Sequence, residues 1–274
     1  MAGPLVTLLT DFGARDPSAA ICRAVIWSIA PEARLLDISH EVAKYAIRDG
    51  ALLLWCALPY TEQAIHVAVV DPGVGTERLP IAIRVARGDT LIGPDNGLLV
   101  PVAERLGGIA EARVLTSAAH RLPTVSTSFH GRDIFAPAAA HLATGVPLAE
   151  LGPAVDPNEL VHLALAEPVI QQGSLRAQVI YRDTFGNAKL GALAADLARA
   201  LGPLAPGTGL TVGVRGRQVD ATWQPTFGTA DPGAPLLYED SYGRLCLAVN
   251  QGNAVEAFDL EDDQPLVITR RTSD

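Results

Sequence analysis

The stretch Val69-Val-Asp-Pro-Gly-Val-Gly-Thr-Glu-Arg78 decides how this chain is organised. It begins at the end of an apolar run, His66-Val-Ala-Val-Val70, which predicts a short buried strand. The strand is followed by Asp71 and by a turn containing Gly73 and Gly75, where the backbone can approach a ligand closely. In open α/β sheets, ligands bind at the carboxyl ends of strands. The stretch therefore predicts a site at the edge of a sheet.

Arg78 follows Asp71 closely enough for the loop to fold its guanidinium back onto the carboxylate. The alternative is an ordinary surface turn with two solvated charges, since Asp, Pro and Gly are common turn formers. The rest of the chain has to decide between these two interpretations.

Strands and helices alternate on both sides of this stretch. Asp16 and Pro17 favour a helix start, with Asp as the N-cap and Pro at the first helical position. We expect strands over residues 4–10, 34–38, 66–70, 81–86 and 90–92, and helices over residues 16–29, 45–58 and 98–106. Such alternation predicts an α/β fold with a mostly parallel sheet flanked by helices. Polar loops follow three of the strands, after Thr10, Val70 and Ile92, where a site is expected.

The pattern changes around residues 150–168, which prolines punctuate. Beyond them we expect short strands over residues 175–181, 210–214, 236–238, 245–249 and 266–269, with one helix over 194–201. This predicts a second, smaller, mainly antiparallel β domain. We therefore expect an N-terminal α/β domain over residues 1–165 and a C-terminal β-rich domain over residues 170–274.

Composition excludes several classes of function. The formal net charge of −9 argues against non-specific nucleic-acid binding. Cys22, Cys56 and Cys246 lie far apart, as is typical of a protein in the reducing cytoplasm. The longest apolar run, residues 51–58, is too short to span a bilayer, and no secretion signal is visible. The sequence contains no HExxH, no Cys/His cluster and no GxGxxG after the first strand, so we expect no metal and no nicotinamide cofactor.

His130 lies between Phe129 and Gly131, just before an Ala-rich stretch over residues 138–145 that predicts a helix. A single histidine is more often structural or solvated than catalytic. Its place at a loop-to-helix junction nevertheless favours exposure to a cleft.

Taken together, these stretches resemble one family, the S-adenosyl-L-methionine (SAM) hydroxide adenosyltransferases. These are adenosine-forming SAM hydrolases, related to the SAM-dependent fluorinase and chlorinase. The motifs that carry the resemblance are Thr10-Asp-Phe-Gly13, Val70-Asp-Pro-Gly-Val-Gly75 with Arg78, Pro94-Asp-Asn-Gly97, Phe129-His-Gly-Arg-Asp-Ile-Phe-Ala-Pro137, Asp183-Thr-Phe-Gly-Asn187, Ser241-Tyr-Gly-Arg-Leu245 and Ala248-Val-Asn-Gln-Gly-Asn253. They span nearly the whole chain in the family's order.

The resemblance implies that water attacks C5′ of the SAM ribose and that L-methionine leaves, giving adenosine. It places the family's water-handling triad at Asp71, Arg78 and His130. The leaving group is a neutral thioether, so no general acid is needed, but the water must be oriented and must lose its proton. Which of the three groups accepts that proton stays open.

The resemblance also implies a set of substrate contacts. Asp11 is expected on the ribose hydroxyls, Phe185 and Phe227 around the adenine, Asn187 on the adenine edge, Asp183 and Ser241 on the methionine end, and Tyr45 and Phe129 in the pocket wall. Core packing is the alternative for Phe185 and Phe227. Where the fluorinase has an arginine after the serine, this chain has Tyr242, so the contact to the methionine carboxylate stays open.

Two other functions compete with SAM hydrolysis. The halogenases carry Tyr in place of the triad aspartate, whereas this chain has Asp71. The other competitor is a SAM or adenosine sensor with negligible turnover. The resemblance further implies a homotrimer whose site lies between the N-terminal domain of one subunit and the C-terminal domain of its neighbour. The implied ligands are SAM, adenosine and L-methionine, with no cofactor beyond the substrate.

Overall fold

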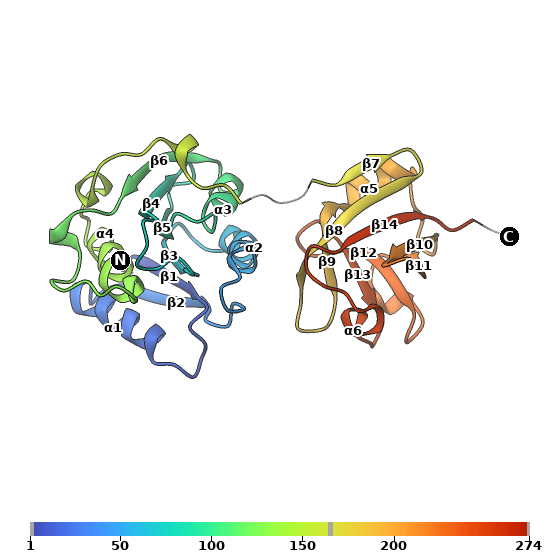
Figure 1. Ribbon diagram of the computed structural model, residues 1–274, viewed down its shortest axis with the longest axis horizontal. Helices are drawn as coiled ribbons and strands as arrows, with labels where there is room; N and C mark the ends of the chain where they lie inside the picture. Colours follow the sequence, from blue (N-terminus) through green and yellow to red (C-terminus); the bar gives the residue numbers. More distant parts are fainter. Residues whose placement is uncertain (1–2, 164–166, 273–274) are drawn as a thin grey trace. The chain divides into compact units, whose positions relative to one another are not determined.

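The computed structural model of the chain describes residues 3–163 and 167–272. The chain forms two compact units, Met1–Leu163 and Ala164–Asp274 (Figure 1). Among the described residues, none of the helices combines the length and the apolar character that crossing a membrane requires.

The first unit is built on a six-stranded sheet with the order β2-β1-β3-β5-β4-β6. Its strands are β1 (Leu5–Thr10), β2 (Arg34–Ser39), β3 (Ile65–Val69), β4 (Pro80–Val85), β5 (Thr90–Pro94) and β6 (Ile109–Val114). Strands β2, β1, β3 and β5 are parallel, as expected. β4 is antiparallel to both of its neighbours, because a short hairpin joins it to β5 and leaves no room for a crossover. The sheet is therefore mixed, and β6 was not predicted.

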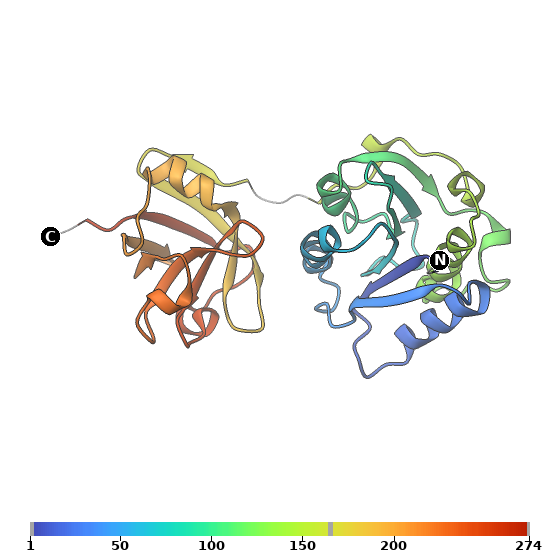
Figure 2. The ribbon, with the colours of Figure 1, turned by 180° about the vertical axis from the view of Figure 1, so that it is seen from behind.

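Helices cover both faces of this sheet (Figures 1 and 2). They are α1 (Ser18–Ile29), α2 (Ile47–Ala57), α3 (Val100–Arg105) and α4 (Ala136–Ala143). Side chains alternate along β3, so that Val67 and Val69 pack with α1 and α4 while Ala68 packs with α2 and α3. This alternation buries both faces and explains the continuous apolar run in the sequence.

Each of the helices α1 to α4 begins one or two residues away from the start expected from the sequence. α1 begins after Pro17 rather than at it, although Asp16 Oδ1 does accept a hydrogen bond from Ser18 N at 2.8 Å. α2 begins at Ile47, two residues late, because Tyr45 has a positive φ of 64° that a helix cannot contain.

The second unit is a largely antiparallel sheet with the order β14-β10-β11-β12-β13-β9-β8-β7. Its elements are β7 (Val169–Gln171), β8 (Ser174–Arg182), β9 (Ala188–Leu193), α5 (Ala194–Leu201), β10 (Gly209–Val214), β11 (Arg217–Trp223), β12 (Pro235–Glu239), β13 (Arg244–Val249), α6 (Ala254–Phe258) and β14 (Pro265–Arg270). β14 also pairs with β8, which closes the sheet into a barrel-like ring and leaves β7 as an added strand. The pair β11–β12 is parallel. The sequence did not predict the closure of the ring, nor the elements β7, β9, β11 and α6.

Candidate active site

The three residues of the expected triad lie together in the first unit. Asp71 follows β3, Arg78 lies in the loop before β4, and His130 precedes a π-helical turn, Gly131–Phe135, that leads into α4. Arg78 Nε lies 3.0 Å from each carboxylate oxygen of Asp71, and Nη2 donates to Oδ2 as well. Nη2 also donates to His130 Nδ1 at 2.8 Å. The interpretation of this loop as a turn with two solvated charges is therefore wrong.

Gly75 allows the Asp71 loop to approach the His130 loop. Its φ is +78°, and a Cβ at this position would lie 2.3 Å from the carbonyl oxygen of Thr127. Any other residue would clash with that backbone and would also be strained by the positive φ. The glycine in the motif thus brings two distant segments into contact.

The Asp71–Arg78 pair is almost fully buried, with side chains only 5% and 9% exposed. Burial strengthens a bidentate pair of this kind, and it makes the loss of either partner costly. Arg78 Nη1 is buried without a hydrogen-bond partner among the described residues. The guanidinium therefore retains an unused donor.

His130 is held in its neutral form. Burial lowers its pKa, and the positive charge of Arg78 lowers the pKa further. Because a guanidinium has only donors, the 2.8 Å contact requires Nδ1 of His130 to be an acceptor. The network therefore assigns the imidazole proton to Nε2.

A cavity of about 110 Å³ opens beside Asp71 and His130. Its lining combines residues from four loops: Asp11, Phe12, Tyr45, Val69, Asp71, Val74, Ser128, Phe129, His130 and Gly131. The predicted pocket residues of the first unit, Asp11, Tyr45 and Phe129, are thus brought to the triad. Ligand pockets usually measure roughly 300–1,000 Å³. This cavity alone can therefore hold only part of a nucleoside-sized ligand.

Asp11 is fixed by the segment before α2. Its Oδ2 accepts a hydrogen bond from Tyr45 N at 3.0 Å, and its carbonyl oxygen accepts one from Lys44 Nζ. The positive φ of Tyr45 turns this backbone N–H toward Asp11 and leaves the tyrosine side chain 69% exposed. Strained backbone of this kind is common at functional sites.

The remaining predicted contacts lie in the second unit. Asp183, Phe185 and Asn187 share the turn between β8 and β9. Asp183 Oδ1 accepts hydrogen bonds from Phe185 N and Asn187 N, both at 3.0 Å, and Oδ2 accepts one from Asn187 Nδ2 at 2.9 Å. Phe185 is 79% exposed, so core packing does not account for it.

Phe227 and Ser241 lie on other turns of the second unit. Phe227 opens a 3-10 turn, and its ring packs against Tyr238 with centroids 4.8 Å apart. Ser241 is exposed in the turn between β12 and β13. Beside it, Lys189 Nζ lies 4.7 Å from the ring centroid of Tyr242 and pairs with Asp240 at 2.6 Å. The structure thus places a cation next to Tyr242.

One supporting residue, Asp133, was missed by the sequence analysis. Its Oδ2 accepts hydrogen bonds from both N and Oγ of Ser126, and Ser126 Oγ accepts one from Phe129 N. Burial would raise the pKa of Asp133, but the hydrogen bonds from Arg132 and Ser126 lower it overall. Asp133 thereby anchors the loop that carries His130. The sequence signal that could have identified Asp133 was its position in the Phe129–Pro137 motif.

Comparisons with known proteins agree with this arrangement. Residues 6–152 match the SAM hydroxide adenosyltransferase N-terminal domain, and residues 177–267 match the C-terminal domain. The chain is 40% identical over 269 residues to the (R)-S-adenosyl-L-methionine hydrolase of Salinispora arenicola, covering 97% of this chain and 98% of that protein. It is 28% identical to a fluorinase of an Actinoplanes species, over 97% of this chain and 98% of that protein.

A solved structure extends the agreement to the fold. The crystal structure of an uncharacterized conserved protein from Thermotoga maritima superimposes with a TM-score of 0.90 at 32% identity. The match covers 97% of this chain and 100% of that one. With both domains matched in order over nearly its full length, the chain belongs to the SAM hydroxide adenosyltransferase family.

Proposed function

We propose that this chain hydrolyses SAM to adenosine and L-methionine by in-line attack of water on ribose C5′. The observation that carries the proposal is the cluster of the buried Asp71–Arg78 pair and the partly buried His130 beside a cavity, in a chain 40% identical to an (R)-SAM hydrolase. Because that relative is named for the (R) form, we propose the (R) sulfonium epimer as the preferred substrate.

The network suggests a role for each group. The electrons of the breaking C5′–S bond pass to sulfur, which leaves as a neutral thioether. The attacking water becomes the 5′-hydroxyl of adenosine and must lose one proton. His130 Nδ1 is already occupied by Arg78, and Nε2 carries the proton, so the imidazole serves as a hydrogen-bond donor. We therefore propose Asp71 as the acceptor of the proton.

Arg78 then has a positioning role. Its unpartnered Nη1 is a buried donor, and a buried donor without an acceptor is costly in a folded protein. A water molecule held there would satisfy the donor. The neutral Asp71–Arg78 pair would also present no net charge to the sulfonium, which carries the substrate's positive charge.

We propose substrate contacts from both units. In the first unit, Asp11 holds the ribose hydroxyls, and Tyr45 and Phe129 line the pocket. In the second unit, Phe185, Phe227 and Asn187 bind adenine, whereas Asp183 and Ser241 bind the methionine end. A carboxylate has about four acceptor positions. The loop of Asp183 occupies three of them, which leaves one for an ammonium group.

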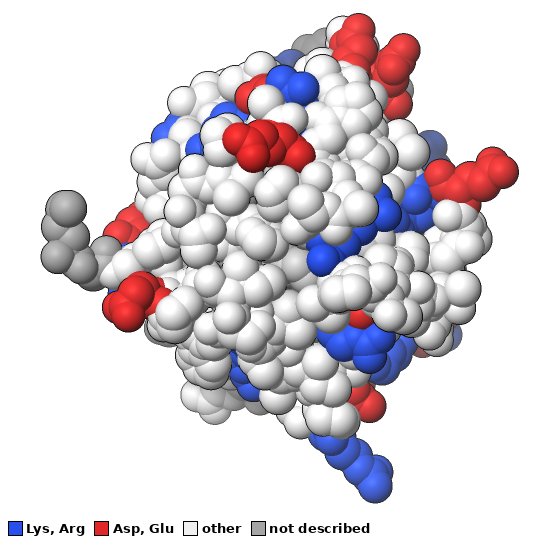
Figure 3. All heavy atoms as spheres, turned by 90° about the vertical axis from the view of Figure 1, so that its left-hand side faces the viewer, with Lys and Arg blue, Asp and Glu red and all other residues white. Residues whose placement is uncertain are grey.

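Since each unit carries part of this set, we propose a homotrimer in which different subunits complete one site. The small cavity of the first unit and the exposed side chains of Tyr45 and Phe185 support a shared site. We propose no cofactor, no nucleic-acid partner and no membrane partner. On the face of the molecule in Figure 3, basic side chains occur in small separate groups among acidic and uncharged ones. None of the three cysteines forms a disulfide, which supports a cytoplasmic location.

The test is to incubate the purified protein separately with (R)- and (S)-SAM and to follow adenosine and methionine by chromatography. Chloride and fluoride are added in parallel to detect halogenated nucleosides, and a chelator is added to remove metals. We expect adenosine and methionine in equal amounts, a faster reaction with the (R) epimer, and no effect of the chelator. Absence of adenosine despite measurable SAM binding would favour the sensor, and a 5′-halogenated product would favour the halogenase.

A further inference from the structure

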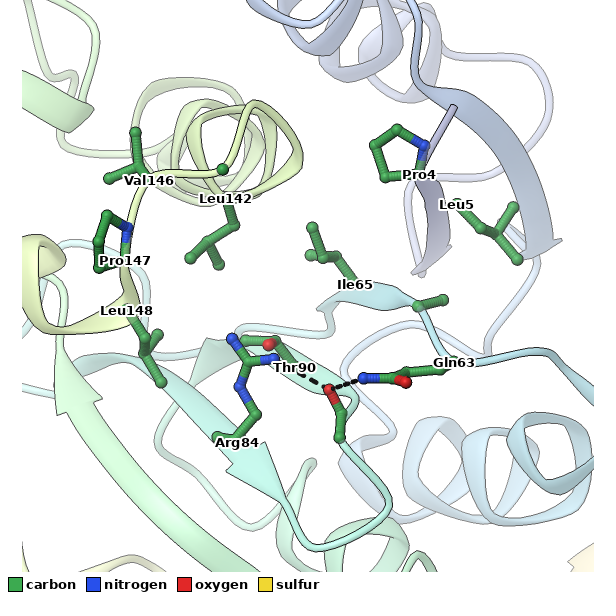
Figure 4. A pocket seen from close by; sticks show the side chains of 13 residues that line it. Pro4, Leu5, Gln63, Ile65, Arg84, Thr90, Leu142, Val146, Pro147 and Leu148 are labelled. Atoms are coloured by element: carbon green, nitrogen blue, oxygen red, sulfur yellow. Dashed lines mark hydrogen bonds between the residues drawn. The ribbon is translucent and has the colours of Figure 1, made fainter. Parts of the chain in front are cut away.

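A second cavity lies at the opposite edge of the first unit's sheet from the triad (Figure 4). Its lining includes the first residues of three parallel strands, Leu5 of β1, Ile65 of β3 and Thr90 of β5. Asp11 and Asp71 follow the last residues of β1 and β3, so the length of a strand, roughly 17 Å, separates the two cavities. The volume is about 370 Å³, within the usual range for small-molecule sites. This cavity is therefore separate from the candidate active site.

One side of the cavity is apolar. Leu142 comes from the end of α4, and Val146 and Leu148 come from the segment that follows it. Figure 4 shows Leu142 and Ile65 directed toward one another across the opening. An aliphatic group of a ligand would be shielded from water between them.

Arg84 supplies the only charge in the lining. Its Nη1 donates to the carbonyl oxygen of Gly88 at 2.9 Å, and no carboxylate pairs with it in the described parts of the chain. Glu111 lies opposite Arg84 in the β4–β6 register, but Arg113 pairs with that carboxylate at 2.6 Å. The guanidinium thus keeps its charge and several of its five donors for another acceptor.

The position of Arg84 is fixed by a rigid hairpin. Gly88 forms the turn between β4 and β5 with a φ of +100°, and its carbonyl oxygen also accepts a hydrogen bond from Gln63 Nε2 at 2.7 Å. The next residue, Asp89, is completely buried and is held by Arg87 and His66. These hairpin contacts keep the guanidinium in place before a ligand arrives, which reduces the entropy cost of ordering it on binding.

We propose that this cavity binds a small monocarboxylate with an apolar body. The carboxylate would pair with Arg84, whose planar fork matches two carboxylate oxygens. The body would lie against Ile65, Leu142 and Leu148. The lining contains no acidic side chain that could hold a cation, and a single arginine matches one negative charge.

The experiment is calorimetric titration of the intact protein with isocaproate, in the presence of saturating adenosine so that the candidate active site is occupied. We expect saturable binding of one isocaproate per chain. Isocaproamide has the same shape without the charge, so its affinity should be lower by about tenfold or more. Arg84→Gln should weaken isocaproate binding by about tenfold or more, and Arg84→Lys, which keeps the charge but loses the fork, by less.

Arg199→Gln is the matched control, since Arg199 is an exposed arginine of α5 in the second unit. It should leave isocaproate binding unchanged, and thermal unfolding should show that all variants fold. No saturable binding by the folded wild-type protein up to about 10 mM, a concentration that would detect even a weak site, would overturn the proposal. Equal isocaproate affinity in wild type and folded Arg84 variants would overturn it as well.

Discussion

The side-chain amide of Asn96 donates a 2.9 Å hydrogen bond to the carbonyl oxygen of Val70, the residue immediately before Asp71. The Oδ1 atom of the same side chain accepts a hydrogen bond from Leu98 N at 3.2 Å. One side chain therefore joins the end of β3 to the turn after β5. It fixes the point at which Asp71 leaves the sheet.

Asn96→Ala should lower the turnover of SAM about tenfold or more while leaving its Michaelis constant nearly unchanged. The physical reason is that a small displacement of Asp71 would disturb attack geometry, and displacements of about 1 Å can cost roughly 10²-fold. Steady-state kinetics provides the measurement. Asn158→Ala is the control, since within the described residues the side chain of Asn158, in the same unit, bonds only to nearby Asp156. An unchanged turnover number for folded Asn96→Ala would refute the positioning role.

Asp71→Ala, Arg78→Ala and His130→Ala should each reduce the single-turnover rate by roughly 10²–10⁴-fold. Their affinity for adenosine should change little, because the proposed contact of these groups is the water. Because all three act on one water, double variants should lose less than the product of the single losses. Asp11→Ala should instead weaken adenosine binding, measured by calorimetry. Full single-turnover rates in both Arg78→Ala and His130→Ala would rule out the assignment.

The rate should have an acid limb below pH 6.5. Burial and the charge of Arg78 hold the pKa of His130 below its usual 6.5. The neutral form, which accepts from Arg78, exists above that lowered pKa, so the rate should fall as the pH falls through it. The measurement is the single-turnover rate between about pH 4.5 and 8, near the range in which histidines titrate. A rate that already declines between pH 8 and 7 would contradict this assignment.

Stability of the first unit should also decline in mild acid, through His66. This side chain is 1% exposed, lies 2.8 Å from Thr7 Oγ1 and 3.0 Å from Asp89 Oδ1, and burial lowers its pKa from 6.5. Below pH 6.5 the unfolded chain binds a proton that the folded chain resists. The free energy of unfolding should therefore fall with pH, by at most about 1.4 kcal/mol per pH unit for this group.

Urea unfolding at two pH values, one above and one below 6.5, measures this effect. His66→Gln should be less stable than wild type but should lose less stability between the two values. His162→Gln, a substitution on the surface, should behave like wild type. Equal losses in wild type and His66→Gln would show that other groups cause the decline.

Subunits with complementary defects should restore activity if the site is shared. Asp71→Ala disables the proposed water site in the first unit, and Phe227→Ala disables the proposed adenine contact in the second. Trimers that contain both chains would have some interfaces with two intact halves, so part of the activity should return. Absence of recovery in mixed trimers verified by mass spectrometry would point to a site within one subunit.

The sequence predicted those parts of the fold that depend on continuous burial. β3 is an example, since four of its five residues are buried and its apolar run has no other explanation. β11 was missed because three of its seven residues are exposed and only Ala221 is fully buried, and polar side chains interrupt the run. Pairing with β10 and β12 stabilises this strand, and such pairing leaves little trace in local sequence.

The same distinction applies to the sites. Asp71 and Arg78 are close in sequence, so their pairing could be proposed from the loop length. The bond from Asn96 to Val70 and the cavity around Arg84 each join segments far apart in the chain. A sequence gives the residue types of such contacts but not the directions in which their side chains point. These features therefore emerged only from the tertiary structure.

The strand that closes the barrel-like ring follows all other strands of the second unit in sequence. β14 pairs with both β10 and β8, so the ring stays open until residues 265–270 are in place. During synthesis, these residues leave the ribosome after every strand of the first unit. The first unit can therefore fold while translation continues, and the second can complete its fold only after residues 265–270 have emerged.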